Sequence, residues 1–153
     1  YVLTQEGVYL VQLRYGAALP KSALQLVSRQ LFAADEAPVA FEFKDFSLAQ
    51  HDGKWVLSPA AGDLSPDDIN RWIDEWRLAS ALAVQAADNR KPLTTIKVKL
   101  KSGSELTLAV LQREPELMLA RSDQPFAYQF TGGIVKRLLA PPATAANAPT
   151  DKR

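Results

Sequence analysis

The clearest alternation of apolar and polar positions lies in residues 64–83 and has the period of a helix. The apolar side chains of this stretch recur about every 3.6 residues and therefore share one helical face: Ile69, Trp72, Ile73, Trp76 and Ala83. Ser65 suits the N-cap position and Pro66 suits the first helical position, so the start of the helix is well defined. The pattern predicts an amphipathic helix over residues 65–83 with both tryptophans in the core.

Alternation with a period of two marks the strands. Residues 39–43 alternate between apolar and polar side chains, and the phase slips at Phe46, which favours a bulge or a bend. Asp52 and Gly53 then predict a tight hairpin. The same alternation, interrupted by turn residues, predicts further strands in several segments: 54–57, 96–100, 106–110, 117–119 and 126–130.

Weaker patterns occupy both ends of the chain. Residues 8–11 indicate a strand, residues 21–32 indicate a short helix, and residues 134–139 indicate a short apolar helical turn. Residues 141–153 have few groups to bury, so we expect a flexible tail.

Together these elements predict one α+β domain. We expect a twisted antiparallel sheet of about five or six strands, with the main amphipathic helix packed on one face. Shorter helices are expected near Lys21 and Ile134.

The two ends of the chain share a weak similarity. Residues 1–12 and residues 118–130 each contain two strand-like runs that lead into an apolar helical stretch. The similarity indicates either an internal repeat or a chance likeness between two amphipathic hairpins. A repeat would make residues 1–34 the end of a preceding similar unit, packed as one domain with a complete unit over residues 35–140.

Composition narrows the classes of partner. The 153 residues include 18 basic and 17 acidic side chains, so no strong field draws the protein to nucleic acid or to an anionic membrane. The chain has no cysteine, which excludes disulfides and thiol chemistry. No apolar run reaches the length of about 18 residues that a membrane-spanning helix needs. Because the chain starts at Tyr1 without a methionine, we expect a longer protein whose upstream part holds any targeting segment.

No set of residues predicts catalysis or metal binding. His51, the one histidine, is expected at an exposed hairpin tip without partner ligands at zinc-site spacings. Asp63, Asp67 and Asp68 could form a calcium or acid/base cluster, but their positions better suit the start of the helix. The glycine pair at Gly132 lacks the other residues of a phosphate-binding loop. We therefore predict no catalytic, cofactor-binding or metal residue, no cofactor, and a protein that is not an enzyme.

Two groups of residues are predicted to form an interaction surface. Lys97, Lys99 and Lys101 share one face of a strand, where they either keep a sheet from unwanted pairing or contact lipid headgroups or a protein. No aromatic residue lies among them to stack on bases, so nucleic acid is not an expected partner. Leu78 and Leu82 point away from the apolar stripe of the helix and are expected to touch another unit or a partner.

Several of these features together resemble a known family. They are the segment Gly53-Lys-Trp-Val-Leu-Ser-Pro, the acidic helix start, the segment Asp74-Glu-Trp-Arg-Leu-Ala-Ser-Ala and a tyrosine-containing strand before a closing helix. Over residues 1–140 the chain is similar to the bacterial family called domain of unknown function 4340. The resemblance implies an envelope protein on the periplasmic side of the bacterial inner membrane, accessory to an ABC-transporter-type complex and anchored through a segment missing from this chain. It carries over no active-site residue.

Two functional hypotheses follow. The first is a non-enzymatic periplasmic interaction module that docks a protein partner of a membrane complex through its sheet face or through the outward side of the main helix. The second is a binding module for a small apolar or glycan ligand, in which Trp55 and Tyr128 line a pocket. An exposed tryptophan beside a concave pocket would favour the second hypothesis.

Overall fold

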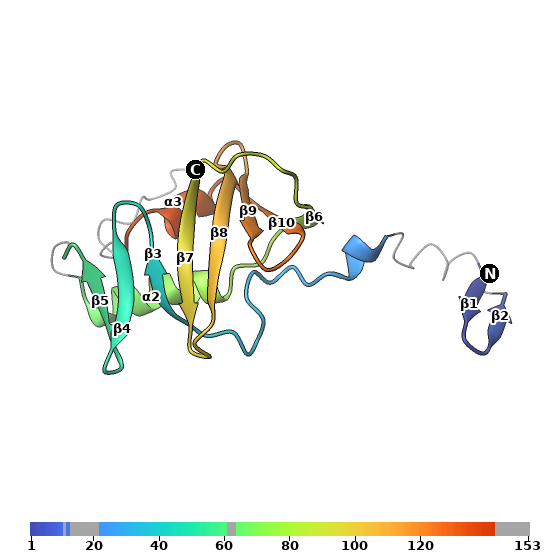
Figure 1. The fold of residues 1–153 in the computed structure, drawn as a ribbon, viewed down its shortest axis with the longest axis horizontal. Coiled ribbons are helices and arrows are strands. Elements are labelled where there is room, and N and C mark those ends of the chain that lie inside the picture. The colour runs from blue at the N-terminus through green and yellow to red at the C-terminus, as the bar shows by residue number, and fades with distance from the viewer. Residues whose placement is uncertain (11, 13–21, 61–63, 143–153) are drawn as a thin grey trace.

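The computed structural model describes residues 1–10, 12, 22–60 and 64–142 (Figure 1). Its main body is one antiparallel sheet of eight strands: β3 (Pro38–Glu42), β4 (Ser47–His51), β5 (Lys54–Ser58), β6 (Ala83–Ala86), β7 (Thr94–Leu100), β8 (Glu105–Gln112), β9 (Leu117–Arg121) and β10 (Phe126–Phe130). The order across the sheet is β5-β4-β3-β7-β8-β9-β10-β6. The helices α2 (Pro66–Arg77) and α3 (Ile134–Leu139) lie on the same side of this sheet.

The fold is mostly β, so the predicted α+β class with five or six strands is wrong. Besides the eight-stranded sheet, β1 (Val2–Thr4) and β2 (Gly7–Tyr9) pair into a small two-stranded sheet. Among the described residues, α2 with 12 residues is the one helix of more than two turns, since α3 has 6. The observed strand number exceeds the predicted one because the alternation did not predict β4 and β6 as separate strands. The helical content is lower than predicted because the main helix ends early.

The start of α2 is confirmed. Ser65 is the N-cap, and the Asp68 N–H donates to its hydroxyl oxygen at 3.1 Å, while the Ser65 N–H donates to an Asp68 carboxylate oxygen at 3.2 Å. This reciprocal capping box satisfies two of the free N–H groups at the helix start. Asp67 lies in the same first turn, whereas Asp63 is outside the described residues.

α2 ends at Arg77, short of the predicted end at residue 83. The following segment has small side chains that would tolerate a helix, but tertiary hydrogen bonds hold its backbone extended. These bonds are Leu31 N–H to the Ala79 carbonyl (3.0 Å), Ala81 N–H to the Arg29 carbonyl (2.8 Å) and Leu82 N–H to the Gln129 carbonyl (2.8 Å). Because tertiary pairing overrides helix propensity, the chain continues as β6, the edge strand beside β10.

The phase slip at Phe46 is a hairpin turn rather than a bulge. The Phe43 N–H donates to the Phe46 carbonyl at 2.9 Å and closes the turn between β3 and β4. The next turn places Asp52 and Gly53 at positive φ angles of 50° and 78°. Positive φ at both central residues defines a type I′ turn, so the predicted Asp-Gly hairpin is confirmed.

The tryptophans of α2 lie in the core, as predicted. Trp72 is 5% exposed and Trp76 is 0% exposed, and each ring centroid lies 5.3 Å from that of Phe41 on β3. The Trp72 indole N–H also donates to the Ala140 carbonyl at 2.9 Å. This bond fixes the end of α3 against α2.

The helix predicted over residues 21–32 is not formed. Within residues 22–32 the structure has one turn of 3-10 helix, η1 (Ala23–Leu26), followed by an extended segment. Leu31 and Phe32 in that segment are buried in the core. β2 confirms part of the strand predicted at residues 8–11. The flexible tail was predicted over residues 141–153, of which residues 143–153 lie outside the described residues.

Candidate functional site

The carboxyl end of α2 carries a large apolar side chain that the core does not cover. Leu78 is the C-cap residue, and its N–H donates to the Asp74 carbonyl at 2.8 Å, so the last helical turn sets its position. The Leu78 side chain is 74% exposed. It points away from the buried face of α2, as the helical phase predicts.

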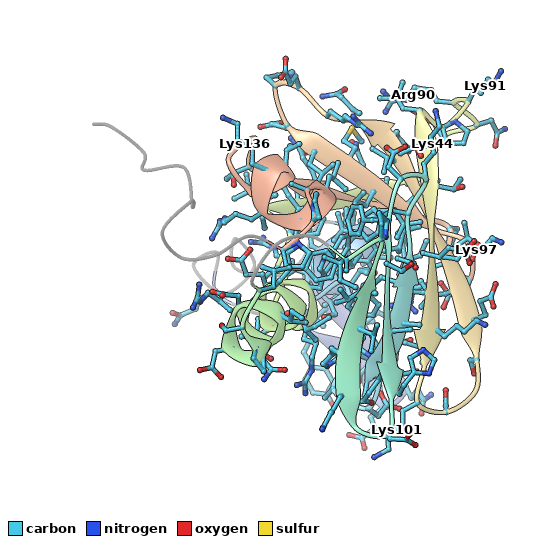
Figure 2. The ribbon with its side chains drawn as sticks, turned by 90° about the vertical axis from the view of Figure 1, so that its left-hand side faces the viewer. Lys44, Arg90, Lys91, Lys97, Lys101 and Lys136 are labelled. Atoms are coloured by element: carbon cyan, nitrogen blue, oxygen red, sulfur yellow. The ribbon has the colours of Figure 1, made fainter. Side chains whose placement is uncertain are left out.

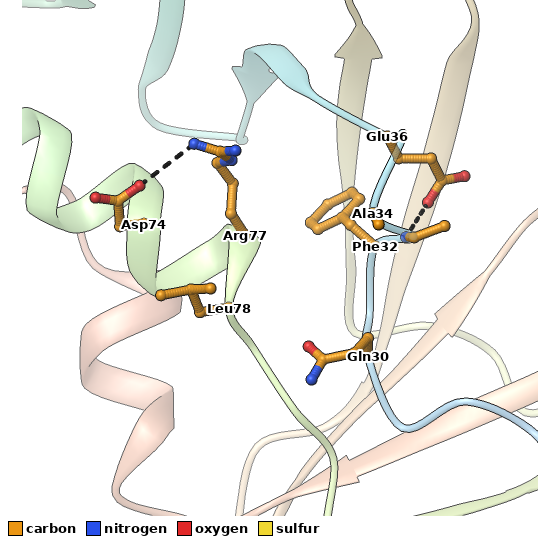
Figure 3. A pocket seen from close by; sticks show the side chains of 8 residues that line it. Gln30, Phe32, Ala34, Glu36, Asp74, Arg77 and Leu78 are labelled. Atoms are coloured by element: carbon orange, nitrogen blue, oxygen red, sulfur yellow. Dashed lines mark hydrogen bonds and ion pairs between the residues drawn. The ribbon is translucent and has the colours of Figure 1, made fainter.

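Leu78 stands between two hollows. The first, of about 400 Å³, lies between α2 and the extended segment 30–36, and Figure 3 shows Phe32 on the wall across from α2. The second, of about 450 Å³, lies between α2 and α3 and is lined by Ile134 and Arg137. We call Leu78, Phe32, Ile134 and these two hollows the Leu78 surface. Hollows beside an apolar side chain can receive the anchor residues of a protein partner.

Ion pairs border the Leu78 surface. Their N···O distances are 3.6 Å for Arg77 and Asp74, 3.4 Å for Arg71 and Asp68, and 4.0 Å for Arg137 and Glu75. The Arg77–Asp74 pair is exposed on both sides, and such pairs contribute about 0–1 kcal/mol to stability. In the Arg71–Asp68 pair the Asp68 side chain is buried, at 9% exposed. Because the charges are paired, the surface combines an apolar centre with a polar rim of no strong net field.

A third groove, of about 440 Å³, opens between α2 and the β4–β5 hairpin. Its lining has apolar members, Val39, Trp55 and Ile73, and polar members, Gln50, Asn70, Asp74, Arg77 and Lys101. Tyr128 is not among them, because it is 2% exposed and its hydroxyl donates to the Gln124 amide oxygen at 2.7 Å. A pocket lined by both Trp55 and Tyr128 is therefore not formed.

The structure does not bring the predicted lysines and leucines into one patch. Lys97 and Lys99 alternate with buried residues of β7 and lie on the sheet face opposite α2, where Figure 2 shows Lys97. The Lys97 ammonium lies 3.8 Å from a Glu42 carboxylate oxygen, and Lys99 is directly opposite Glu105 on β8. These neighbouring carboxylates favour the interpretation of a solvated sheet face. Lys101, just beyond β7, lines the Trp55 groove instead.

Leu82 is 52% exposed and immediately precedes β6. Its backbone pairs with Gln129 of β10, so it lies at a sheet edge rather than on a helix. The predicted exposure is confirmed, and the predicted helical setting is wrong.

A buried charged cluster around Arg121 was missed from the sequence. The Arg121 side chain is 2% exposed, and its guanidinium donates to three groups. They are the Leu31 carbonyl (2.6 Å), the Glu36 carboxylate (2.7 and 2.8 Å) and the Asp123 carboxylate (2.7 and 2.9 Å). Glu36 also accepts from the Ala33 N–H at 2.8 Å. The cluster therefore ties the extended segment before β3 to the β9–β10 hairpin.

The electrostatics of this cluster are those of a structural site. Hydrogen bonds from Arg121 hold the pKa of the Glu36 carboxyl and the pKa of the Asp123 carboxyl below their usual range. Burial raises the pKa of the Tyr128 hydroxyl. A guanidinium whose donors are occupied by two carboxylates and a carbonyl has little left to offer a ligand.

The sequence does contain a signal for Arg121. Leu117, Leu119 and Arg121 occupy alternate positions of β9 and are all buried. An arginine on the inward face of a strand has to find buried partners. Asp123 is only two residues away along the chain, but Glu36 could not be identified from spacing, because it is 85 residues away.

The histidine, the described acidic residues and the glycines considered above lie at turns, caps and packing positions. Within the described ranges, no group of three or more His, Cys, Asp and Glu side chains is placed to hold a metal ion. His51 is exposed at the end of β4. At Gly132 a Cβ would lie 2.3 Å from the Pro115 carbonyl oxygen, so close packing requires glycine there. No helix in the described part of the chain is long and apolar enough to cross a bilayer.

Comparison with known proteins identified no related protein. No protein-family model, no curated protein and no solved structure matches the chain. The resemblance to the domain of unknown function 4340 family therefore stays a prediction, and the surfaces described above carry the functional argument.

Proposed function

We propose that this protein is a non-enzymatic interaction module that docks a partner protein on the Leu78 surface. The observation that carries the proposal is the position of Leu78, which is 74% exposed between hollows of about 400 and 450 Å³. The backbone of Leu78 is already held at the end of a helix, so binding costs little further conformational entropy there. The hollows beside it can receive apolar side chains of the partner.

The chemistry of the surroundings specifies the kind of partner. Paired arginines and carboxylates border the surface, so the rim offers polar contacts without selecting a highly charged ligand. The half-buried Ile134 supplies an apolar wall on one side of Leu78, and on the other side the 3% exposed Phe32 contributes only its edge to the hollow. We infer a protein partner that inserts apolar side chains on both sides of the leucine.

The location of this module is part of the proposal. The family resemblance supports the periplasmic side of a bacterial inner membrane, with an ABC-transporter-type complex as the source of the partner. Anchoring to that membrane would use a segment outside this chain. The sheet face around Lys97 is a weaker docking surface, because a carboxylate accompanies that lysine.

The test is quantitative affinity purification of the tagged protein from gently solubilised membranes, with Leu78→Glu compared with the wild type. Placing a carboxylate in an apolar contact requires its desolvation. We therefore expect recovery of the partner to fall at least about tenfold, which corresponds to about 1.4 kcal/mol. The captured protein is then purified and its direct binding to the chain is measured.

Leu93→Glu is the matched control. Leu93 is 64% exposed in the connection before β7, away from α2. It introduces the same charge at a similarly exposed leucine, and we expect partner recovery to stay unchanged. The proposal fails if no membrane-complex subunit depends on Leu78, or if both variants reduce recovery equally.

A further inference from the structure

The Trp55 groove has the lining of a small-ligand site. It shares Asp74 with both Leu78 hollows and Arg77 with the first of them, but Leu78, Phe32 and Ile134 do not line it. Trp55 comes from β5, Ile73 from α2 and Val39 from β3, so three elements contribute to its apolar part. Its volume of about 440 Å³ falls in the range of about 300–1,000 Å³ that is typical of ligand pockets.

The polar side chains of this groove have hydrogen-bonding capacity left over. The Gln50 amide makes one long bond, 3.5 Å to the Gly53 carbonyl. Within the described part of the chain, the Asn70 side-chain amide has no hydrogen-bond partner. Two planar amides therefore face the groove with donors and acceptors that a ligand could use.

The charge in the groove is also unbalanced. Asp74 and Arg77 pair with each other at 3.6 Å. No carboxylate among the described residues lies within ion-pair distance of the Lys101 ammonium. The groove therefore offers one cation for an anionic group on a ligand, next to an aromatic ring and two amides.

We propose that this groove binds a saccharide that carries a carboxylate, with the sugar ring on Trp55 and the carboxylate at Lys101. One face of a pyranose ring is formed by C–H groups, which pack on the negative face of an indole. The hydroxyl groups around the ring pair with planar amides and carboxylates, as Gln50, Asn70 and Asp74 provide. This inference goes beyond the docking function and does not depend on it.

The experiment is a titration of the 153-residue chain with trigalacturonic acid, followed by the tryptophan indole resonances in nitrogen-15 NMR spectra. Trp72 and Trp76 are at most 5% exposed, so a ligand in the groove should move the Trp55 indole signal most. Maltotriose, a neutral trisaccharide, measures the contribution of the carboxylates. We expect at least about tenfold weaker binding of maltotriose.

Two lysine variants separate the groove from general charge attraction. Lys101→Gln removes the unpaired cation and should weaken trigalacturonic acid binding about tenfold while leaving maltotriose unchanged. Lys99→Gln removes the same charge from the opposite sheet face and should change neither affinity.

Three results would overturn the proposal. They are an unmoved Trp55 signal at millimolar trigalacturonic acid, equal affinity for the neutral sugar, and equal weakening by the two lysine variants. Leu78→Glu should leave sugar binding intact, since Leu78 does not line this groove. Failure of the saccharide site is thereby distinguished from failure of the docking surface.

Discussion

Replacing Arg121 by methionine should destabilise the fold more than any surface change. The substitution keeps an unbranched apolar stem and removes a guanidinium that is 2% exposed. Its loss deprives the Leu31 carbonyl, Glu36 and Asp123 of hydrogen bonds of 2.6–2.9 Å. The variant therefore leaves two carboxylates close together without their shared cation.

The expected loss in the free energy of unfolding depends on how well water can reach the Glu36 and Asp123 carboxylates once Arg121 is removed. Removing one member of a buried ion pair costs about 3–5 kcal/mol, mostly because the other charge stays buried. The Glu36 side chain is 21% exposed and the Asp123 side chain is 47% exposed, so water can reach both once Arg121 is gone. We therefore expect the lower end of the range, a loss of about 3 kcal/mol in the free energy of unfolding.

The assay is urea denaturation at neutral pH, followed by circular dichroism. Glu36→Gln keeps the shape of the side chain and removes one charge, and it serves as the second arm of a double-mutant cycle with Arg121→Met. We expect a coupling energy of about 0.5–3 kcal/mol, the range found for residues in one network. A loss below about 1 kcal/mol for Arg121→Met would refute the reasoning, because it would mean that the cluster is no more important than an exposed ion pair.

The pH dependence gives an independent check of the same cluster. The pKa values of Glu36 and Asp123 are lower in the folded protein than in the unfolded chain. Their contribution is therefore fully present above the unfolded pKa values of about 4 and is lost as the pH falls through the folded values. The stability gap between wild type and Arg121→Met should stay constant near neutral pH and shrink below about pH 4. A gap that is the same at pH 3 and pH 7 would contradict this assignment.

Further substitutions test the packing of the helices, with urea denaturation as the measurement throughout. Trp72→Ala should cost about 3–5 kcal/mol through a core cavity, whereas Trp72→Phe, which mainly loses the hydrogen bond, should cost about 1 kcal/mol; equal costs would contradict the core assignment. Ser65→Ala should cost about 1 kcal/mol by removing the helix cap. Gly132→Ala should destabilise the fold, since its Cβ would meet the Pro115 carbonyl. His51→Ala, at an exposed turn, should change stability by less than about 0.5 kcal/mol and leave binding unchanged.

Features that depend on residues close together in the sequence could be predicted, whereas features that depend on distant hydrogen-bond partners could not. The capping box at Ser65, the buried tryptophans and the Asp52-Gly53 turn depend on neighbours a few residues apart, and all three are confirmed. The end of α2 and the strand β6 depend on hydrogen bonds to Leu31, Arg29 and Gln129, which no local pattern reveals.

The same distinction between local and long-range features applies to the candidate surfaces. The exposure of Leu78 follows from helical phase alone, and the structure agrees with it. The hollows beside it could not be predicted, because their walls come from the segment before β3 and from α3. Lys101 was grouped with Lys97 and Lys99 by its spacing, but the chain leaves β7 before it and takes it to a different groove.

The position of β6 constrains how the protein acquires its fold. β6 is made before β7, directly after α2, yet its partner in the sheet is β10, the last strand in the described part of the chain. During synthesis β6 has to wait for Phe130 to leave the ribosome before its ladder can close. Non-local closure of this kind slows folding and links the two halves of the chain into one cooperative unit. A chain shortened before β10 loses two ladders, β10 with β9 and β10 with β6, and leaves β6 without a partner strand.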